Sequence, residues 1–318
     1  MAQSASPDRV TDLNLPRGQI GAATPPAGAK RLIGRSRARA SLVPDLLVEA
    51  RRIANTVISG WHGRRKRGIG ENFWQFRPFT EGENPARIDW RRSARDENLY
   101  LRDREWEAVH TVWLWADGSP SMQYQSGAAQ TSKQERALVL ALAMAEVLAR
   151  SGERIGYVGS GAPITHRQAA ERLAEKLARL PVDKGHWPDT GMLKAHTDLI
   201  ITSDFLGPLN HTLERIDALA SRRIRGHLVH IIDPAEEAFP YSGRTDFVDP
   251  ERGVRLTAGR AETMAAEYRQ HFSARQDELR RAATRRGWSY IVHHTDKPAS
   301  QALVALHLRM SEASLGVS

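Results

Sequence analysis

Five short apolar segments, which alternate with helical stretches over the last two thirds of the chain, place the strongest constraint on its fold. They occupy residues 111–117, 154–160, 198–204, 227–233 and 289–295. Helical periodicity follows or precedes them at 131–151, 167–180, 209–222, 260–286 and 299–312. Near-continuous apolar strands that alternate with helices are typical of a parallel sheet covered on both faces. The sequence therefore predicts a doubly wound, mostly parallel α/β domain over residues 108–318.

The first third of the chain has a different character. Residues 1–40 are rich in Ala, Pro, Gly, Ser and Arg without an apolar period, which predicts a disordered basic tail. Residues 42–59 carry one apolar stripe and predict an amphipathic helix that ends at Gly60. Residues 61–107 are polar, contain Trp, Gly and Pro, and predict short strands and ordered loops. The expected organisation is thus a tail, an N-terminal helix with an Arg/Trp-rich segment over 41–107, and the α/β domain.

Composition excludes several classes of protein. The 318 residues include no cysteine, which excludes a disulfide scaffold, a thiolate metal site and a cysteine nucleophile. The net charge is +9, and all of this excess lies in residues 1–104, with 20 Lys/Arg against 11 Asp/Glu. A neutral domain with a basic front segment fits this distribution better than a uniformly basic nucleic-acid binder. The start of the chain lacks the apolar core of a secretory leader, so we expect a cytoplasmic protein.

Hydroxyl and carboxylate side chains follow two of the predicted strands. Asp117, Ser119 and Ser121 form a D-x-S-x-S pattern after the first strand, and Asp204 ends the strand at 198–204. Ligands of such sheets bind at the carboxyl ends of the strands, where these side chains are expected to meet. Hard oxygen ligands of this kind suit Mg²⁺. The alternative is structural, because Asp and Ser after a strand also form turns and helix caps.

A second pattern lies upstream, in the run R-P-F-T-E-G-E-N-P-A-R-I-D-W from Arg77 to Trp90. It resembles the signature of the bacterial domain-of-unknown-function family number fifty-eight, whose members carry a von Willebrand factor A-like domain. Phe79 stands where that family usually has Tyr. The matching positions are Arg77, Gly82, Glu83, Arg87, Ile88, Asp89, Trp90, Ala94 and Arg95.

The resemblance implies a fold, a site and a partner. Asp117, Ser119 and Ser121 look like the metal-ion-dependent adhesion site of von Willebrand factor A domains, with Asp204 as the second Asp and Thr190 as the candidate loop Thr. Such a site binds Mg²⁺ or another divalent cation and leaves a position for an acidic side chain of a partner. The family is usually encoded beside MoxR-type AAA+ ATPases, which implies an adaptor in a chaperone-like or assembly role. The signature residues are then a partner-docking surface, or else a purely structural salt-bridge network.

Two other functions stay open. A Mg²⁺-dependent hydrolase would use Asp117 and Asp204 to activate water, but no general base is evident beside them, so the sequence favours a non-enzymatic role. The basic run Arg64–Arg67, with Trp61 and Phe73 on either side, also permits contact with phosphates. Since no recognition helix accompanies this run, nucleic acid is the weaker expectation.

Overall fold

The computed structural model describes residues 28–62, 75–80, 88, 90–95, 98–103, 110–180 and 185–315. The chain forms two compact units: residues 1–58 together with 111–318, and residues 59–110. The larger unit contains the α/β domain and the candidate metal residues. The smaller unit contains the signature segment, and each unit is described by itself.

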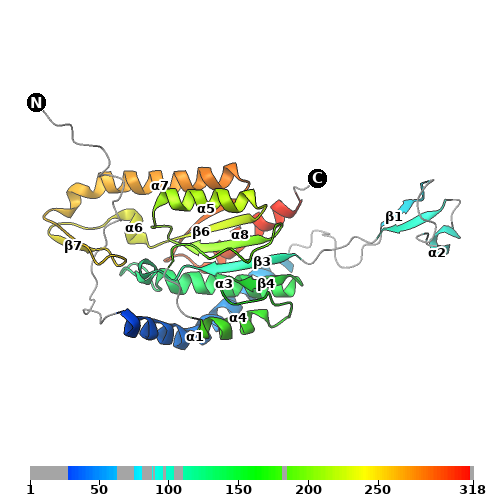
Figure 1. Ribbon diagram of the computed structural model, residues 1–318, viewed down its shortest axis with the longest axis horizontal. Coiled ribbons are helices and arrows are strands. Elements are labelled where there is room, and N and C mark those ends of the chain that lie inside the picture. The colour runs from blue at the N-terminus through cyan, green and yellow to red at the C-terminus, as the bar shows by residue number, and fades with distance from the viewer. Residues whose placement is uncertain are drawn as a thin grey trace, which may run out of the picture. The chain divides into compact units, whose positions relative to one another are not determined.

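The larger unit is built on a parallel sheet of five strands (Figure 1). The strands are β3 (Thr111–Ala116), β4 (Arg154–Tyr157), β5 (Asp198–Ser203), β6 (Arg225–Ile232) and β9 (Ser289–His294). Their order is β4-β3-β5-β6-β9, and every neighbouring pair is parallel. All five correspond to the predicted apolar segments, so the prediction of a mostly parallel α/β domain is confirmed. The strand order reverses between β3 and β5, which is where ligands bind in open sheets of this kind.

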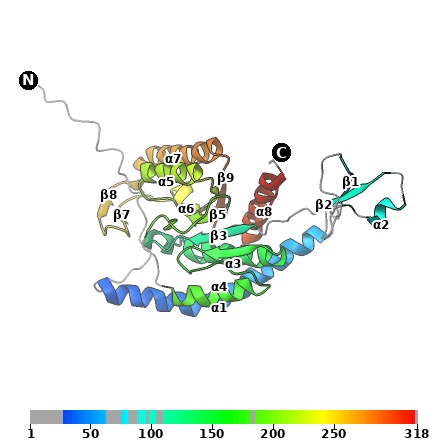
Figure 2. The same ribbon diagram turned by 45° about the vertical axis from the view of Figure 1, so that its right-hand side comes forward.

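Helices cover both faces of this sheet (Figure 2). One face is covered by α5 (Leu209–Ser221) and α7 (Ala265–Arg285), and the other by α3 (Lys133–Arg150) and α8 (Ala299–Leu315). The helix α4 (Ala169–Arg179) packs on α3. Burial between the two layers of helices explains the apolar character of the strands. In β5, for example, every residue is buried.

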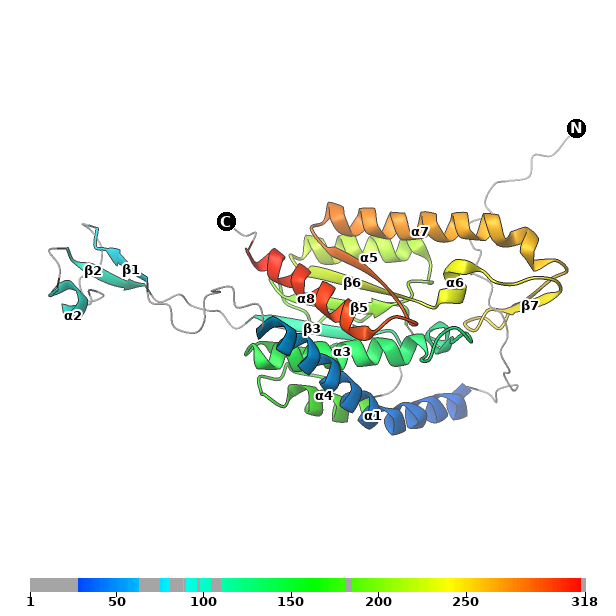
Figure 3. The same cartoon turned by 180° about the vertical axis from the view of Figure 1, so that it is seen from behind.

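The helix α1 (Gly28–His62) lies outside α3 and α4 in the view from behind (Figure 3). Its predicted apolar stripe comprises Leu46, Leu47, Ala50, Ile53, Ala54 and Val57, and all of these are buried except Leu47, which is partly exposed. The predicted boundaries of the helix were wrong. It begins at Gly28, inside the expected disordered tail, because Ala, Arg, Lys and Leu in that stretch favour helix even without an apolar period. Residues 1–27 of the expected tail lie outside the described residues.

The smaller unit contains an antiparallel pair, β1 (Gln75–Pro78) and β2 (Tyr100–Asp103), with the short helix α2 (Trp90–Ser93). Two hydrogen bonds extend this pair: Phe79 N donates to Leu99 O at 2.7 Å, and Tyr100 N, at the start of β2, donates to Ser93 Oγ of α2 at 2.9 Å. These strands confirm the expectation of short strands in this segment.

Two antiparallel strands of the larger unit were not predicted. They are β7 (Thr245–Val248) and β8 (Arg255–Ala258), which form a hairpin after the short helix α6 (Pro234–Ala238). Phe247 of β7 is buried in a cluster that also holds Phe239, Tyr268 and Phe272. This packing fixes the base of the hairpin against α7.

Gly226 of β6 provides a direct test of the sheet packing. A methyl group at this position would overlap the ring of Trp288, which is buried and donates from Nε1 to Ile224 O at 3.1 Å. We expect Gly226→Ala to lower the free energy of unfolding by about 1–3 kcal/mol or more, because the buried ring must shift to make room for the methyl group. Urea unfolding measures this, with Gly259→Ala as control, since no atom lies within 4 Å of that added methyl group. Equal midpoints for the two variants would contradict the packing.

Candidate functional site

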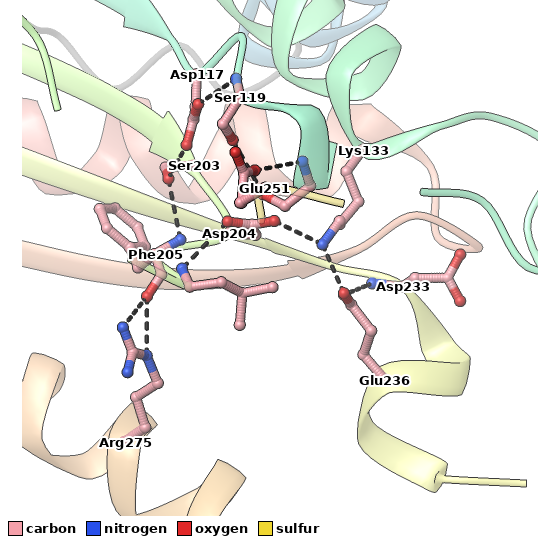
Figure 4. A network of polar contacts seen from close by, with 12 residues as sticks. Asp117, Ser119, Lys133, Ser203, Asp204, Phe205, Asp233, Glu236, Glu251 and Arg275 are labelled. Carbon is pink, nitrogen blue, oxygen red and sulfur yellow. Dashed lines mark hydrogen bonds and ion pairs between the residues drawn. The ribbon is translucent and has the colours of Figure 1, made fainter. Parts of the chain in front are cut away.

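The candidate site lies at the carboxyl ends of β3 and β5, on the two sides of the strand-order reversal (Figure 4). Asp117, Ser119 and Ser121 follow β3, and Ser203 and Asp204 end β5. All five side chains are buried, with exposed fractions of 0–2%. The structure therefore brings together the four residues that sequence reasoning placed at one edge of the sheet.

Asp117 connects the two strand ends. Its Oδ1 accepts from the backbone N of Ser119 at 2.7 Å, and its Oδ2 accepts from Ser203 Oγ at 2.6 Å. Ser203 Oγ in turn accepts from the backbone N of Phe205 at 2.9 Å. The carboxylate therefore closes the turn after β3 and ties that turn to β5.

The two serines present their hydroxyls to each other. Ser119 precedes the 3₁₀ turn η3 (Pro120–Gln123), and Ser119 Oγ lies 2.9 Å from Ser121 Oγ. Two ligands at adjacent corners of an octahedron with bonds of roughly 2.1 Å lie about 3 Å apart. The separation of the hydroxyls thus fits a pair of Mg²⁺ ligands, and Pro120 between them fixes the backbone in the turn.

A buried lysine places a positive charge within the site. Lys133 Nζ lies 2.7 Å from Asp204 Oδ2 and 2.6 Å from Glu236 Oε1, and its side chain is 0% exposed. Asp204 Oδ1 accepts from Leu206 N at 3.1 Å. Lys133 is the first residue of α3, so the helix start positions the ammonium between the ends of β5 and β6.

Further carboxylates lie around the site. Asp233 and Glu236 form a capping box at the start of α6, in which Glu236 Oε2 accepts from Asp233 N at 3.0 Å. Asp233 Oδ2 also accepts from Ser126 N at 2.8 Å, which fastens the loop after η3. Glu251, in the turn of the β7–β8 hairpin, accepts from Ser121 N at 2.8 Å.

Burial and neighbouring charges shift the pKa values of two groups in the site. Burial and the neighbouring charge of Asp204 raise the pKa of Asp117 to about 7, although hydrogen bonds from Ser203 and Ser119 oppose this shift. Burial lowers the pKa of His230 to about 3, and Arg275 and Lys133 add to this effect. His230 is therefore neutral, with Nδ1 2.6 Å from the hydroxyl of Tyr290. A bound cation would offset the repulsion between the two aspartates.

Thr190 is not joined to this network by any hydrogen bond in the described part of the chain. It is buried, and its carbonyl accepts from Arg222 at 3.1 Å and from Leu193 N at 3.1 Å. Its expected role as a ligand stays a prediction.

The signature residues belong to the smaller unit. Gly82, Glu83, Arg87 and Asp89 lie outside the described residues, as does the basic run at 64–67. Arg77 lies in β1, Trp90 begins α2 with an exposed fraction of 64%, and Arg95 is exposed. Their role in partner docking stays a prediction.

Sequence reasoning missed Lys133 and Glu251. A weak signal existed for Lys133, because a lysine in the first turn of a helix opposes the helix dipole and needs a compensating partner. The pair Asp233 and Glu236 followed a predicted strand, but their link to a lysine was not foreseen. Glu251 carried no signal, because it lies in the turn of an unpredicted hairpin.

The site is rich in hydroxyl groups as well as carboxylates. In the described ranges, no group of three or more His, Cys, Asp or Glu side chains is arranged to hold a metal ion by itself. A cation there would depend on Ser119 and Ser121, with the charge of Asp117 and Asp204 nearby. Hydroxyl oxygen and carboxylate oxygen are both ligand types that Mg²⁺ accepts.

Comparison with known proteins adds relatives of unknown function. The chain is 27% identical over 222 residues to an uncharacterized protein of Mycobacterium bovis and to uncharacterized proteins of Mycobacterium tuberculosis strains CDC 1551 and H37Rv. Each match covers 62% of this chain and 66% of the relative, so the chain spans just under two thirds of the length of these relatives.

Two solved structures are similar at 15% identity and a TM-score of 0.35. One is a conserved hypothetical protein, BatB, from Bacteroides thetaiotaomicron, with coverage of 65% of this chain and 100% of that chain. The other is an aerotolerance-related membrane protein from Bacteroides fragilis, with coverage of 64% and 99%. In the present chain, none of the helices within the described ranges has the length and apolar character needed to cross a bilayer.

A family model supplies the assignment. The model described as "Protein of unknown function DUF58" matches residues 75–282, which include β1, the signature segment, and the sheet up to α7. This match covers more than half of the 318 residues, and the chain therefore belongs to the DUF58 family.

Proposed function

We propose that this protein is a metal-dependent protein-interaction module with a von Willebrand factor A-like domain. In this proposal Ser119 and Ser121 hold Mg²⁺, and Asp117 and Asp204 supply negative charge around it. The cation supplies an electrophilic centre for a carboxylate of a partner. The 2.9 Å separation of the two buried serine hydroxyls, beside Asp117 and at the strand-order reversal, carries the proposal.

The partner that we propose is a MoxR-type AAA+ ATPase, with a chaperone-like or assembly role for the pair. This part rests on the signature segment from Arg77 to Arg95 and on its resemblance to a family usually encoded beside such ATPases. The exposed side chains of Trp90 and Arg95 are compatible with a docking surface.

Removal of the Asp117 charge tests the cation site. Asp117→Ala would leave Ser119 N and Ser203 Oγ without their acceptor, at a cost of roughly 1–3 kcal/mol each. Asp117→Asn preserves the volume and one acceptor, so it changes the charge with less damage to the fold. We expect Asp117→Asn to weaken Mg²⁺ binding at least about ten-fold, as measured by calorimetric titration. Loss of a single group next to a bound metal typically lowers metal affinity by this factor or more.

The same variants test the partner. Wild type is expected to capture the purified ATPase in Mg²⁺ and to lose it in chelator, whereas Asp117→Asn loses it in both. The control is Asp277→Asn, which removes an exposed aspartate from an ion pair with Arg280 on α7. Equal capture in every condition would refute the metal-dependent function. Metal-dependent hydrolysis of a phosphate ester by wild type, absent in Asp117→Asn, would favour the hydrolase instead.

A further inference from the structure

The turn of the β7–β8 hairpin brings a carboxylate of this chain to the serine pair. Glu251 Oε1 accepts from the backbone N of Ser121 at 2.8 Å, across 130 residues of sequence. Figure 4 shows the Glu251 side chain beside Ser119, where the two serine hydroxyls face each other. The carboxylate is partly buried, with an exposed fraction of 22%.

The hairpin turn holds Glu251 in this place. Asp249 Oδ1 accepts from the backbone N of Glu251 at 2.8 Å and of Arg252 at 3.3 Å. Asp249 N donates to Val254 O at 2.8 Å, and Gly253 N donates to Asp249 O at 2.8 Å. Gly253 adopts a φ of +71°, which glycine accepts without strain. These hydrogen bonds, together with the burial of Phe247 in its aromatic cluster, fix the position of the turn that carries Glu251.

The charge of Glu251 has little compensation in the described structure. Among the described residues, the one basic side chain within 4.0 Å of it is the imidazole of His186, whose Nε2 lies 4.0 Å from Glu251 Oε2. Lys133 is already shared by Asp204 and Glu236. A half-buried carboxylate that adds negative charge to an acidic site is costly unless a cation joins it.

We infer that Glu251 is an internal carboxylate ligand of the cation at Ser119 and Ser121. This inference rests on the proposed function, and it changes how the site is used. In the free protein, the position proposed for a partner's acidic side chain is filled by the chain itself. A partner must then displace the hairpin turn, and the free protein is held in a self-liganded form.

Binding of Mn²⁺, as a spectroscopic substitute for Mg²⁺, tests this role. We expect Glu251→Gln to raise the dissociation constant of Mn²⁺ about ten-fold or more, measured by electron paramagnetic resonance. Water-proton relaxation should show about one more exchangeable water on the bound ion, because a protein oxygen has left its shell. In Glu251→Ala, free acetate should restore part of the affinity, whereas it should not tighten Mn²⁺ binding to wild type.

Glu262→Gln is the matched control. It removes a carboxylate that also accepts from a backbone N–H near the hairpin, from Gly243 at 2.7 Å, but does so on the exposed surface. Equal affinity and equal hydration for wild type and Glu251→Gln, without an acetate effect in Glu251→Ala, would overturn the inference and leave the cation site intact. If wild type binds no Mn²⁺ at all, the proposed cation site itself fails, and Glu251 loses this role with it.

Discussion

A free energy of unfolding lower by about 3–5 kcal/mol is expected for Lys133→Met. The ammonium is fully buried between Asp204 and Glu236, whose side chains are 1% and 7% exposed. Methionine fills a similar volume but leaves both carboxylates without their cation, which is the costly way to break a buried ion pair. Urea unfolding in chelator measures the loss without a contribution from bound metal.

Two further variants make the Lys133 result specific. Lys297→Met removes an ammonium from a mostly exposed pair with Asp296, and should cost at most about 1 kcal/mol. Combining Lys133→Met with Asp204→Asn and Glu236→Gln removes the charges together and should recover a large part of the lost stability. A Lys133→Met protein as stable as Lys297→Met would show that the buried triad contributes little.

Acid should destabilise the protein well above the pKa of ordinary carboxylates. Burial lowers the pKa of His230 to about 3 and that of His293 to about 3, from an ordinary value of 6.5. Between pH 6.5 and 3 these histidines are protonated in the unfolded chain but neutral in the folded protein. The free energy of unfolding therefore falls as pH falls through this window. Each such histidine contributes up to about 1.4 kcal/mol per pH unit.

Asp117 acts in the opposite direction. Because its folded pKa is raised to about 7, the folded protein binds a proton before the unfolded chain does, and stability rises as pH falls from 7 towards 3.8. One carboxyl group offsets one of these two histidines, and His307, whose pKa burial lowers to about 4, acts in the same direction as they do. The net loss is therefore at least about 1.4 kcal/mol per pH unit between pH 6.5 and 4. Urea unfolding across this range in chelator measures the slope.

Removal of a single histidine checks the cause. His293→Phe should lower the slope by about one proton, because its ring is 3% exposed and titrates only in the unfolded chain. His211→Gln, on the exposed side of α5, should leave the slope unchanged. Identical slopes for His293→Phe and wild type would mean that the buried ring accepts its proton in the folded state.

The sheet was predictable because its signal is local. The central strands β3, β5 and β6 are buried on both faces and therefore read as nearly continuous apolar runs, as in TVWLWA of β3. The meeting of Asp117 with Asp204 followed from the parallel direction alone, since the carboxyl ends of parallel strands share an edge. These inferences need no knowledge of how side chains pack.

The rest of the site depends on long-range packing that no local pattern encodes. Lys133 reaches Asp204 and Glu236 across 71 and 103 residues, through a helix start and a capping box. Glu251 reaches Ser121 from a hairpin whose strands have only four residues each. The start of α1 was missed for the opposite reason, because helix propensity without an apolar stripe was interpreted as disorder.

The long sequence separations within the site determine when it can form during folding. Its parts are joined across 86 residues between Asp117 and Ser203, and across 130 residues between Ser121 and Glu251. Each of these contacts closes a long loop, whose entropy must be lost before the contact forms, and such contacts are typical of slow folding steps. We therefore expect the oxygen cluster to be absent from partly folded chains. A cation that binds only the completed site would stabilise the folded protein. The gain in the free energy of unfolding would rise with the logarithm of the cation concentration once that concentration exceeds the dissociation constant.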